Sequence, residues 1–173
     1  ARSTPGQGST FTFEVTLAPA VLETVEDPAD SGWAGRAIRV LLAEDHPVNR
    51  RVVELILEPM GVEVLAVENG ELAVGEAAAG SFDVILMDMQ LPVMDGLEAV
   101  KRIRAREGEL GLPPVPICML TANALPHFQT MALEAGADGF LTKPISATAL
   151  VGQIARLVSP VDADRAPPEA ATG

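Results

Sequence analysis

The chain has 173 residues, of which 48% are hydrophobic, and it carries a formal net charge of −12. This length accommodates one domain of ordinary size with extensions, and the hydrophobic share is sufficient for a buried core. The negative charge disfavours binding to nucleic acid or to an anionic membrane surface, because both are negative themselves. No apolar run reaches the roughly 20 residues that cross a bilayer, so we expect a soluble, cytoplasmic fragment without membrane contact.

The first 35 residues differ in composition from the rest of the chain. Ser9–Ala18 alternates apolar and polar residues, which predicts a half-buried strand that lacks the rest of its sheet. Residues 19–35 are rich in acidic residues, Ala, Pro and Gly, a composition typical of a solvated linker. We therefore expect the main domain to begin at residue 36.

From residue 36 onward, short apolar runs alternate five times with amphipathic segments. Such alternation predicts a parallel sheet covered by helices on both faces, so residues 36–159 are expected to form a doubly wound α/β domain. The expected strands, all read as buried, are Ile38–Ala43, Val62–Val67, Phe82–Met87, Val115–Leu120 and Gly139–Leu141. The expected helices are Asn49–Pro59, Glu71–Ala79, Leu97–Arg106, Ala124–Ala135 and Ala147–Val158. Residues 160–173 lack apolar periodicity, which predicts a disordered tail.

Acidic, hydroxyl and basic side chains stand at the ends of these strands. In doubly wound sheets the ligand site forms outside the carboxyl ends of the strands. Three carboxylates gathered there would repel one another, and a hard divalent cation with oxygen ligands accounts for their proximity. Magnesium fits better than calcium or zinc, because the domain has no acidic loop spaced for calcium and no Cys or His cluster for zinc. The residues concerned are Glu44, Asp45, Asp88, Thr121 and Lys143.

Asp88 is the nucleophile that this arrangement favours. A carboxylate can accept a phosphoryl group as an acyl phosphate, and catalysis then consists mainly of positioning and of neutralising charge. Asp88 follows the apolar run VILM and begins the loop LPVMDG, so its side chain can project clear of the sheet. Lys143 would contact a phosphate oxygen as a point charge, and Thr121 would donate its hydroxyl to another.

Four motifs, AEDHPVN, ILMDMQLPVMDG, MLTANAL and GFLTKPI, resemble in order and spacing those of response-regulator receiver domains over residues 37–158. The resemblance implies a flavodoxin-like, five-stranded parallel sheet with strand order 2-1-3-4-5. It identifies Asp88 with the phosphorylation site of the family. It assigns magnesium to Glu44, Asp45 and Asp88, together with the backbone carbonyl of Gln90.

The same resemblance assigns a switch. Thr121 matches the hydroxyl that moves toward the phosphate, and Phe140 stands where the family places a rotating aromatic side chain. Lys143 matches the lysine of the family, and its peptide bond with Pro144 can be cis or trans as far as sequence tells.

The segments MDMQLPVMDG and LTANAL resemble the receivers of hybrid histidine kinases in particular. PGQGSTFTFEVTLA, at residues 5–18, is similar to the glycine-containing turn and closing strands of a histidine kinase ATP-binding domain. This resemblance implies that residues 1–18 are the remnant of that domain and that the parent protein is a hybrid sensor kinase, which can be membrane-anchored. The implied partners are a kinase phosphohistidine domain and a histidine phosphotransfer domain. The rest of the ATP-binding domain is missing, so this chain alone is not expected to hydrolyse ATP.

Two other functions fit parts of the pattern. A magnesium-dependent phosphatase with an aspartyl phosphate intermediate commonly carries a second acid two residues after the nucleophile, where this chain has Gln90. A pseudo-receiver that only binds partners would have lost an essential residue, and Asp45, Asp88, Thr121 and Lys143 are all present. Both alternatives remain open but are less favoured.

Three further features have ordinary explanations. Cys118, the single cysteine, lies in an apolar run and is expected to be a buried thiol. His46 is expected to be a loop residue beside the acidic pair. The basic stretch Lys101–Arg106 is expected to be a solvated helix face rather than a nucleic-acid contact.

Overall fold

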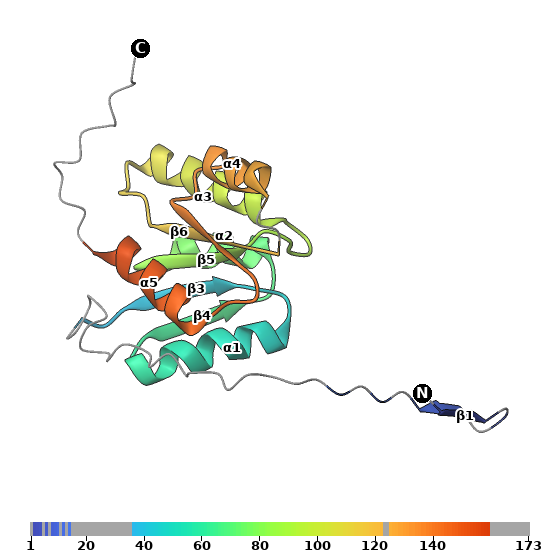
Figure 1. The fold of residues 1–173 in the computed structure, drawn as a ribbon. Coiled ribbons are helices and arrows are strands. Elements are labelled where there is room, and N and C mark those ends of the chain that lie inside the picture. The colour runs from blue at the N-terminus through green and yellow to red at the C-terminus, as the bar shows by residue number, and fades with distance from the viewer. Residues whose placement is uncertain are drawn as a thin grey trace, which may run out of the picture.

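The computed structural model describes residues 2–4, 6, 8–10, 12, 14, 36–122 and 125–159. Residues 36–159 form a parallel sheet with helices on both faces (Figure 1). Its strands lie in the order β4-β3-β5-β6-β7, which is 2-1-3-4-5 when they are numbered within this sheet. The predicted doubly wound fold and strand order are thus confirmed. The strands are β3 (Arg39–Ala43), β4 (Glu63–Val67), β5 (Val84–Asp88), β6 (Ile117–Thr121) and β7 (Gly139–Thr142).

The helices lie close to their predicted positions. They are α1 (Pro47–Leu57), the 3₁₀ turn η2 (Glu58–Met60), α2 (Gly70–Ala79), α3 (Gly96–Leu110), α4 (Pro126–Glu134) and α5 (Ala147–Val158). Helix α3 runs four residues beyond its predicted end and stops at Gly111, whose φ of 64° is left-handed. This conformation suits glycine and ends the helix. No helix in the described part of the chain is both long and apolar enough to cross a membrane.

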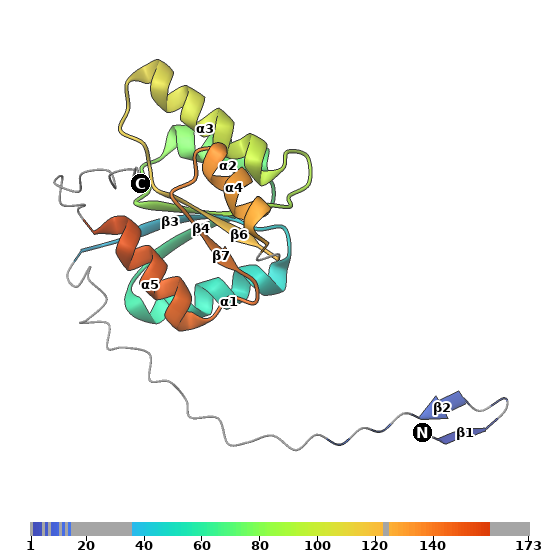
Figure 2. The same ribbon diagram turned by 45° about the horizontal axis from the view of Figure 1, so that its top comes forward.

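The core has two halves, one on each face of the sheet. Successive side chains of a strand point to opposite faces, so Val40 and Leu42 pack with α1 and α5, whereas Leu41 and Ala43 pack with α2, α3 and α4. Figure 2 shows these helices on the two sides of the sheet. Both faces of the central strands are covered, and β5 and β6 are buried at every position.

The prediction that all five strands are buried is wrong for the two outer ones. Strand β4 alternates exposed and partly buried residues, and Leu65 is 37% exposed. In β7 only Gly139 is buried. Each of these strands has a single neighbour in the sheet, so one side of each strand lacks a covering strand.

The N-terminal segment forms a hairpin that is shorter than the predicted strand. β1 (Arg2–Thr4) pairs antiparallel with β2 (Gly8–Thr10), and Gly6 in the turn between them has a φ of 80°. The strand predicted over Ser9–Ala18 ends at Thr10, since Thr12 and Glu14 belong to no regular element. The remainder of that prediction, the linker 19–35 and the tail 160–173 lie outside the described residues.

Candidate functional site

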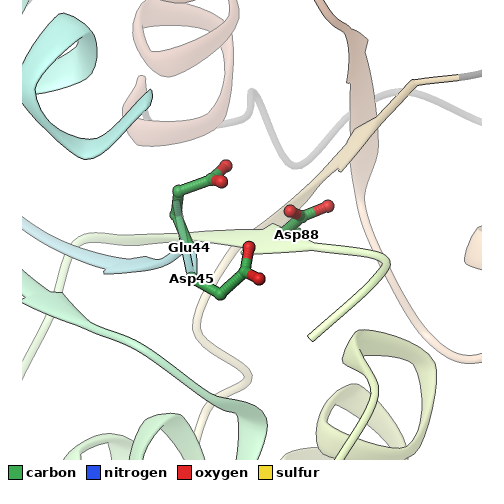
Figure 3. A group of neighbouring side chains, drawn as sticks. All are labelled: Glu44, Asp45 and Asp88. Carbon is green, nitrogen blue, oxygen red and sulfur yellow. The ribbon is translucent and has the colours of Figure 1, made fainter. Parts of the chain in front are cut away.

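The carboxyl ends of the central strands bring together buried polar side chains. Among the described residues, the buried polar or charged side chains are Glu44, Asp88 and Thr121, at 1%, 6% and 3% exposure. Glu44 follows β3, Asp88 is the last residue of β5 and Thr121 is the last residue of β6. Figure 3 shows Glu44, Asp45 and Asp88 gathered at this edge. The predicted site residues on these strands therefore meet in space.

The backbone around Asp88 requires a glycine in the loop that follows. The loop folds back so that the Gly96 amide donates to the carbonyl of Met89 at 3.1 Å. A Cβ atom on Gly96 would lie 2.0 Å from the Asp88 carbonyl oxygen, a distance that no side chain can occupy. Gly96 therefore allows α3 to start directly beside the end of β5.

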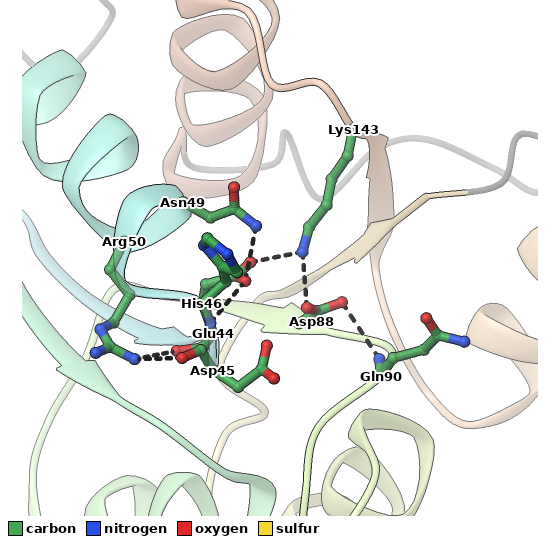
Figure 4. Close-up of polar contacts among 8 residues, drawn as sticks. All are labelled: Glu44, Asp45, His46, Asn49, Arg50, Asp88, Gln90 and Lys143. Atoms are coloured by element: carbon green, nitrogen blue, oxygen red, sulfur yellow. Dashed lines mark hydrogen bonds and ion pairs between the residues drawn. The ribbon is translucent and has the colours of Figure 1, made fainter. Parts of the chain in front are cut away.

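Lys143 connects the two buried acids. Its amide donates to the carbonyl of Thr121 at 2.7 Å, which holds the start of the β7–α5 loop beside β6. Its ammonium lies 2.6 Å from Glu44 Oε2 and 2.7 Å from Asp88 Oδ2 (Figure 4). These are short, charge-assisted hydrogen bonds. The Lys143–Pro144 peptide bond is cis.

The remaining oxygens of the two acids are also bound. Asp88 Oδ1 accepts a hydrogen bond from the Gln90 amide at 3.2 Å. Glu44 Oε1 accepts from Asn49 Nδ2 at 2.9 Å and from the His46 amide at 3.3 Å. Sequence reasoning assigned no role to Asn49, although it is the last residue of the motif AEDHPVN and lies in the first turn of α1.

Burial is the largest influence on the pKa of Asp88. Burial raises the pKa of Asp88 above its ordinary value, because the loss of hydration outweighs the opposing hydrogen bond and charge of Lys143. Repulsion by Glu44 also raises this pKa but is the smallest cause.

At Lys143 the interactions with the two acids, and not burial, decide the direction of the pKa shift. Burial would lower its pKa, but its hydrogen bonds and charge interactions with Asp88 and Glu44 raise it above the ordinary value. The ammonium is therefore held firmly in its charged form between the two carboxylates.

The three acids fit a small, hard cation. Glu44, Asp45 and Asp88 each offer one carboxylate oxygen, and these oxygens lie within 4.8 Å of one another. An all-oxygen donor set without Cys or His matches the preference of Mg²⁺ and not that of Zn²⁺. Asp45 is exposed, which leaves the group open to solvent on one side. The role of the Gln90 carbonyl as a further ligand stays a prediction.

Thr121 and Phe140 lie on the same face of the sheet. In the β6–β7 register, Met119 pairs with Phe140 and Thr121 pairs with Thr142. Thr121 follows Met119 by two residues, so both side chains point to the face that α4 covers. Phe140 is partly buried against the same half of the core. The switch role of this pair stays a prediction.

The structure also describes the three features that were expected to have ordinary structural roles. Cys118 is buried, and burial raises the pKa of its thiol to about 12. His46 is the N-cap of α1, but its side chain makes no capping hydrogen bond. The prediction of a solvated basic face is wrong for Arg104, which binds Glu107, Asp138 and the Gly136 carbonyl at 2.6 to 2.8 Å.

Known proteins support the assignment of a family. Residues 40–155 match the response regulator receiver domain family. The chain is 46% identical over 113 residues to the sensor protein GacS of Pseudomonas syringae pv. syringae, covering 65% of this chain and 12% of GacS. It is 39% identical over 153 residues to the aerobic respiration control sensor protein ArcB of Escherichia coli (strain K12), covering 88% of this chain and 19% of ArcB. The chain thus spans less than a fifth of these relatives' length.

Solved structures agree with the sequence matches. One similar structure is the receiver domain of sensor histidine kinase PA1611 from Pseudomonas aeruginosa PAO1 with a magnesium ion in its active site cleft. Its TM-score is 0.65 and its identity 39%, over 72% of this chain and all of that one. Another comes from the co-crystal structure of the Saccharomyces cerevisiae histidine phosphotransfer protein Ypd1 with the receiver domain of Ssk1. Its TM-score is 0.68 and its identity 32%, over 74% of this chain and 95% of that one. The chain belongs to the response regulator receiver domain family.

Proposed function

We propose that this chain is the phosphoacceptor receiver of a hybrid histidine kinase phosphorelay, in which Asp88 takes a phosphoryl group from a phosphohistidine. The observation that carries the proposal is the Lys143 ammonium, which bonds both Glu44 and Asp88 at the carboxyl edge of the sheet. A lysine held in its charged form beside a buried carboxylate is suited to compensate the charge of a phosphoryl group.

The transfer step follows from the chemistry of the side chains. A carboxylate oxygen of Asp88 forms the new bond to phosphorus while the N–P bond of the phosphohistidine breaks and its electron pair stays on the imidazole nitrogen. Lys143 and the hydroxyl of Thr121 would bind the transferred oxygens. Mg²⁺, held by Glu44, Asp45, Asp88 and the Gln90 carbonyl, would supply further positive charge.

An apolar face beside the site supports transfer to a partner protein. Val48, Val52 and Leu55 are 60%, 40% and 53% exposed. They recur at helical spacing along α1, so they form one face of that helix. A hollow of about 120 Å³ joins this face to Lys143 and Pro144. Apolar side chains around a phosphoacceptor suit contact with a protein, and we propose a histidine phosphotransfer domain, as in the Ypd1 complex.

The proposed parent is a hybrid sensor kinase. The match to ArcB covers 88% of this chain, which leaves too few residues outside it to exclude all of residues 1–35, and this supports a shared arrangement upstream of the receiver. We assign residues 1–18 to the end of an ATP-binding domain, 19–35 to a linker, 36–159 to the receiver and 160–173 to a C-terminal tail.

Labelling with radioactive acetyl phosphate in Mg²⁺ and in chelator tests the phosphoacceptor. We expect magnesium-dependent label in the wild type and none in Asp88→Asn, because an amide is no nucleophile toward phosphorus. Asp95→Asn is the matched control, since Asp95 lies in the same loop and accepts a hydrogen bond from the Glu98 amide at 2.8 Å, a capping role that Asn retains. Label that persists in Asp88→Asn, or that disappears in Asp95→Asn, contradicts the assignment.

A further inference from the structure

Arg50 reaches from the first turn of α1 back to the end of β3. Its Nη1 donates to the carbonyl oxygen of Glu44 at 2.8 Å and to that of Asp45 at 2.9 Å (Figure 4). One guanidinium nitrogen therefore holds two consecutive carbonyls of the acid pair. The predicted phosphoacceptor chemistry uses neither Arg50 nor these carbonyls.

Fixing these carbonyls fixes where the acids point. The direction of a carbonyl is set by the ψ angle of its residue, and the same angle determines how the next residue and its side chain are oriented. A bond to the Glu44 carbonyl therefore constrains the direction of the Asp45 side chain. The bond to the Asp45 carbonyl constrains how the chain enters His46, whose amide binds the Glu44 carboxylate.

Little else in this loop performs the same task. His46 is the N-cap of α1 but makes no side-chain capping bond. Asn49 orients the Glu44 carboxylate at 2.9 Å and does not bind Asp45. Arg51, the next residue, extends to Glu54 and Glu58 on the helix surface and is more than half exposed.

We propose that Arg50 is a positioning residue that holds Glu44 and Asp45 in the arrangement that binds a divalent cation. The inference rests on the proposed magnesium site and adds a residue on which the affinity of that site depends. Groups that orient the ligands of a metal typically change its affinity by about 10- to 100-fold when they are removed.

Charge and position predict opposite effects at Arg50. Removing a positive charge near three carboxylates lowers the repulsion that an arriving cation meets, so electrostatics alone predicts tighter binding of Mg²⁺. Losing the hydrogen bonds lets the acid pair move away from its binding arrangement, which predicts weaker binding. The sign of the change in Kd therefore separates the two effects.

Mg²⁺ titration of the full chain, followed by calorimetry, tests the proposal in Arg50→Gln and in the charge-matched control Arg51→Gln. We expect Kd to rise about 10-fold in Arg50→Gln and to stay the same or fall slightly in Arg51→Gln. Arg50→Met, which keeps the aliphatic stem, is expected to match Arg50→Gln and serves if the latter does not fold. Thermal unfolding in chelator is recorded for each variant.

An Arg50 variant that binds Mg²⁺ as tightly as the wild type, or more tightly, overturns the positioning role, even if its melting temperature falls. An equal loss of affinity in Arg51→Gln also overturns it, because Arg51 does not bind the carbonyls of Glu44 and Asp45 and the loss would then not depend on those bonds. A wild type that binds no Mg²⁺ in the millimolar range would overturn both this inference and the proposed magnesium site. If the wild type takes up label from acetyl phosphate and binds Mg²⁺, but Arg50→Gln has the same Kd for Mg²⁺, the positioning role of Arg50 is refuted and the proposed function is not.

Discussion

Replacing Asp88 with Asn should make the metal-free protein more stable. Asp88 is 6% exposed, and burial raises the pKa of its carboxyl above the ordinary value of 3.8. A raised pKa in the folded state means that ionised Asp88 is less favourable in the folded chain than in the unfolded chain. The wild type therefore loses stability as pH rises from below 3.8 through the folded pKa, and the variant does not.

The contacts around residue 88 indicate the size of the gain. The amide has the volume of the carboxyl and keeps an oxygen for the Gln90 amide at 3.2 Å. Lys143 loses the contact at 2.7 Å but keeps Glu44 at 2.6 Å. The loss of that ion pair offsets part of the recovered desolvation, so we expect a net gain of about 1 kcal/mol at pH 7. This corresponds to a rise in Tm of roughly 3–5 °C for a domain of this size.

Thermal and urea unfolding of both proteins between pH 4 and pH 8, with chelator and with Mg²⁺, check this expectation. The difference in free energy of unfolding should shrink as pH falls through the folded pKa toward 4, because the wild-type Asp88 carboxyl then takes up its proton in the folded state. Mg²⁺ should narrow the difference, because it stabilises the form with three carboxylates by binding only the folded chain. A variant that is less stable than the wild type in chelator at pH 7 would refute the reasoning.

Changes at Lys143, at Gly96, at Thr121 and in the N-terminal segment test other parts of the structure. Lys143→Met should cost about 2 kcal/mol at pH 7, because Glu44 and Asp88 stay buried with only neutral donors. The loss should be smaller at pH 5, because the raised pKa of Asp88 rises further without Lys143 and a protonated carboxyl needs no cation; equal losses in urea unfolding at the two pH values would contradict this. Gly96→Ala should lower the free energy of unfolding by about 2–4 kcal/mol, since its Cβ would meet the Asp88 carbonyl. Gly108→Ala in the same helix has no neighbour within 4 Å and should raise it by about 0.5–1 kcal/mol; similar effects of the two changes would show that the close approach at Gly96 does not matter. Beryllofluoride should shift the amide resonances of Thr121, Phe140 and α4 in the wild type, and Thr121→Ala should lose the shift at Phe140; an unchanged response at Phe140 would remove the switch. Deleting residues 1–35 should leave Tm nearly unchanged, because a lone two-stranded hairpin adds little stability, and a large drop would show that this segment packs on the receiver.

Local patterns were sufficient to predict the elements of the receiver. Apolar runs and turn residues gave the five strands and five helices within a few residues, because both periodicities are properties of neighbouring positions. The end of α3 was placed too early. The Arg104–Glu107 pair joins two residues of its last turns and the left-handed Gly111 ends it, and neither feature alters the apolar periodicity.

The exposure of β4 and β7 depends on strand order, which is not local. The strand order implied by the resemblance already places the second and fifth strands at the edges of the sheet. The apolar content of Val62–Val67 suggested burial instead, because composition does not show how many neighbours a strand has. Arg104 shows the same limit, since its partners Gly136 and Asp138 lie more than 30 residues away in sequence.

The site was predictable as a set of residues but not as a set of contacts. Strand ends and motifs named Glu44, Asp88 and Lys143, and the structure places them together. The bridge from Lys143 to Glu44 joins residues 99 positions apart, and no spacing rule predicts which acid a lysine will bind. The balance between burial and repulsion at Asp88 likewise depends on how much water the folded pocket excludes.

For the phosphoacceptor role that we propose, the charges of the site predict that phosphorylation depends on cations more strongly than folding does. Three carboxylates, the ammonium of Lys143 and the guanidinium of Arg50 leave one net negative charge at this edge of the sheet. Converting Asp88 to an acyl phosphate replaces one carboxylate charge with about two phosphate charges, so the excess rises to about two. The hydroxyl of Thr121 can donate a hydrogen bond to the phosphate but brings no charge. Because binding free energies are reciprocal, a cation that favours the phosphorylated form must itself bind that form more tightly. The free energy of phosphorylation, obtained from the extent of labelling, should therefore depend more steeply on Mg²⁺ concentration than the free energy of unfolding of the unphosphorylated chain, obtained from its melting temperature.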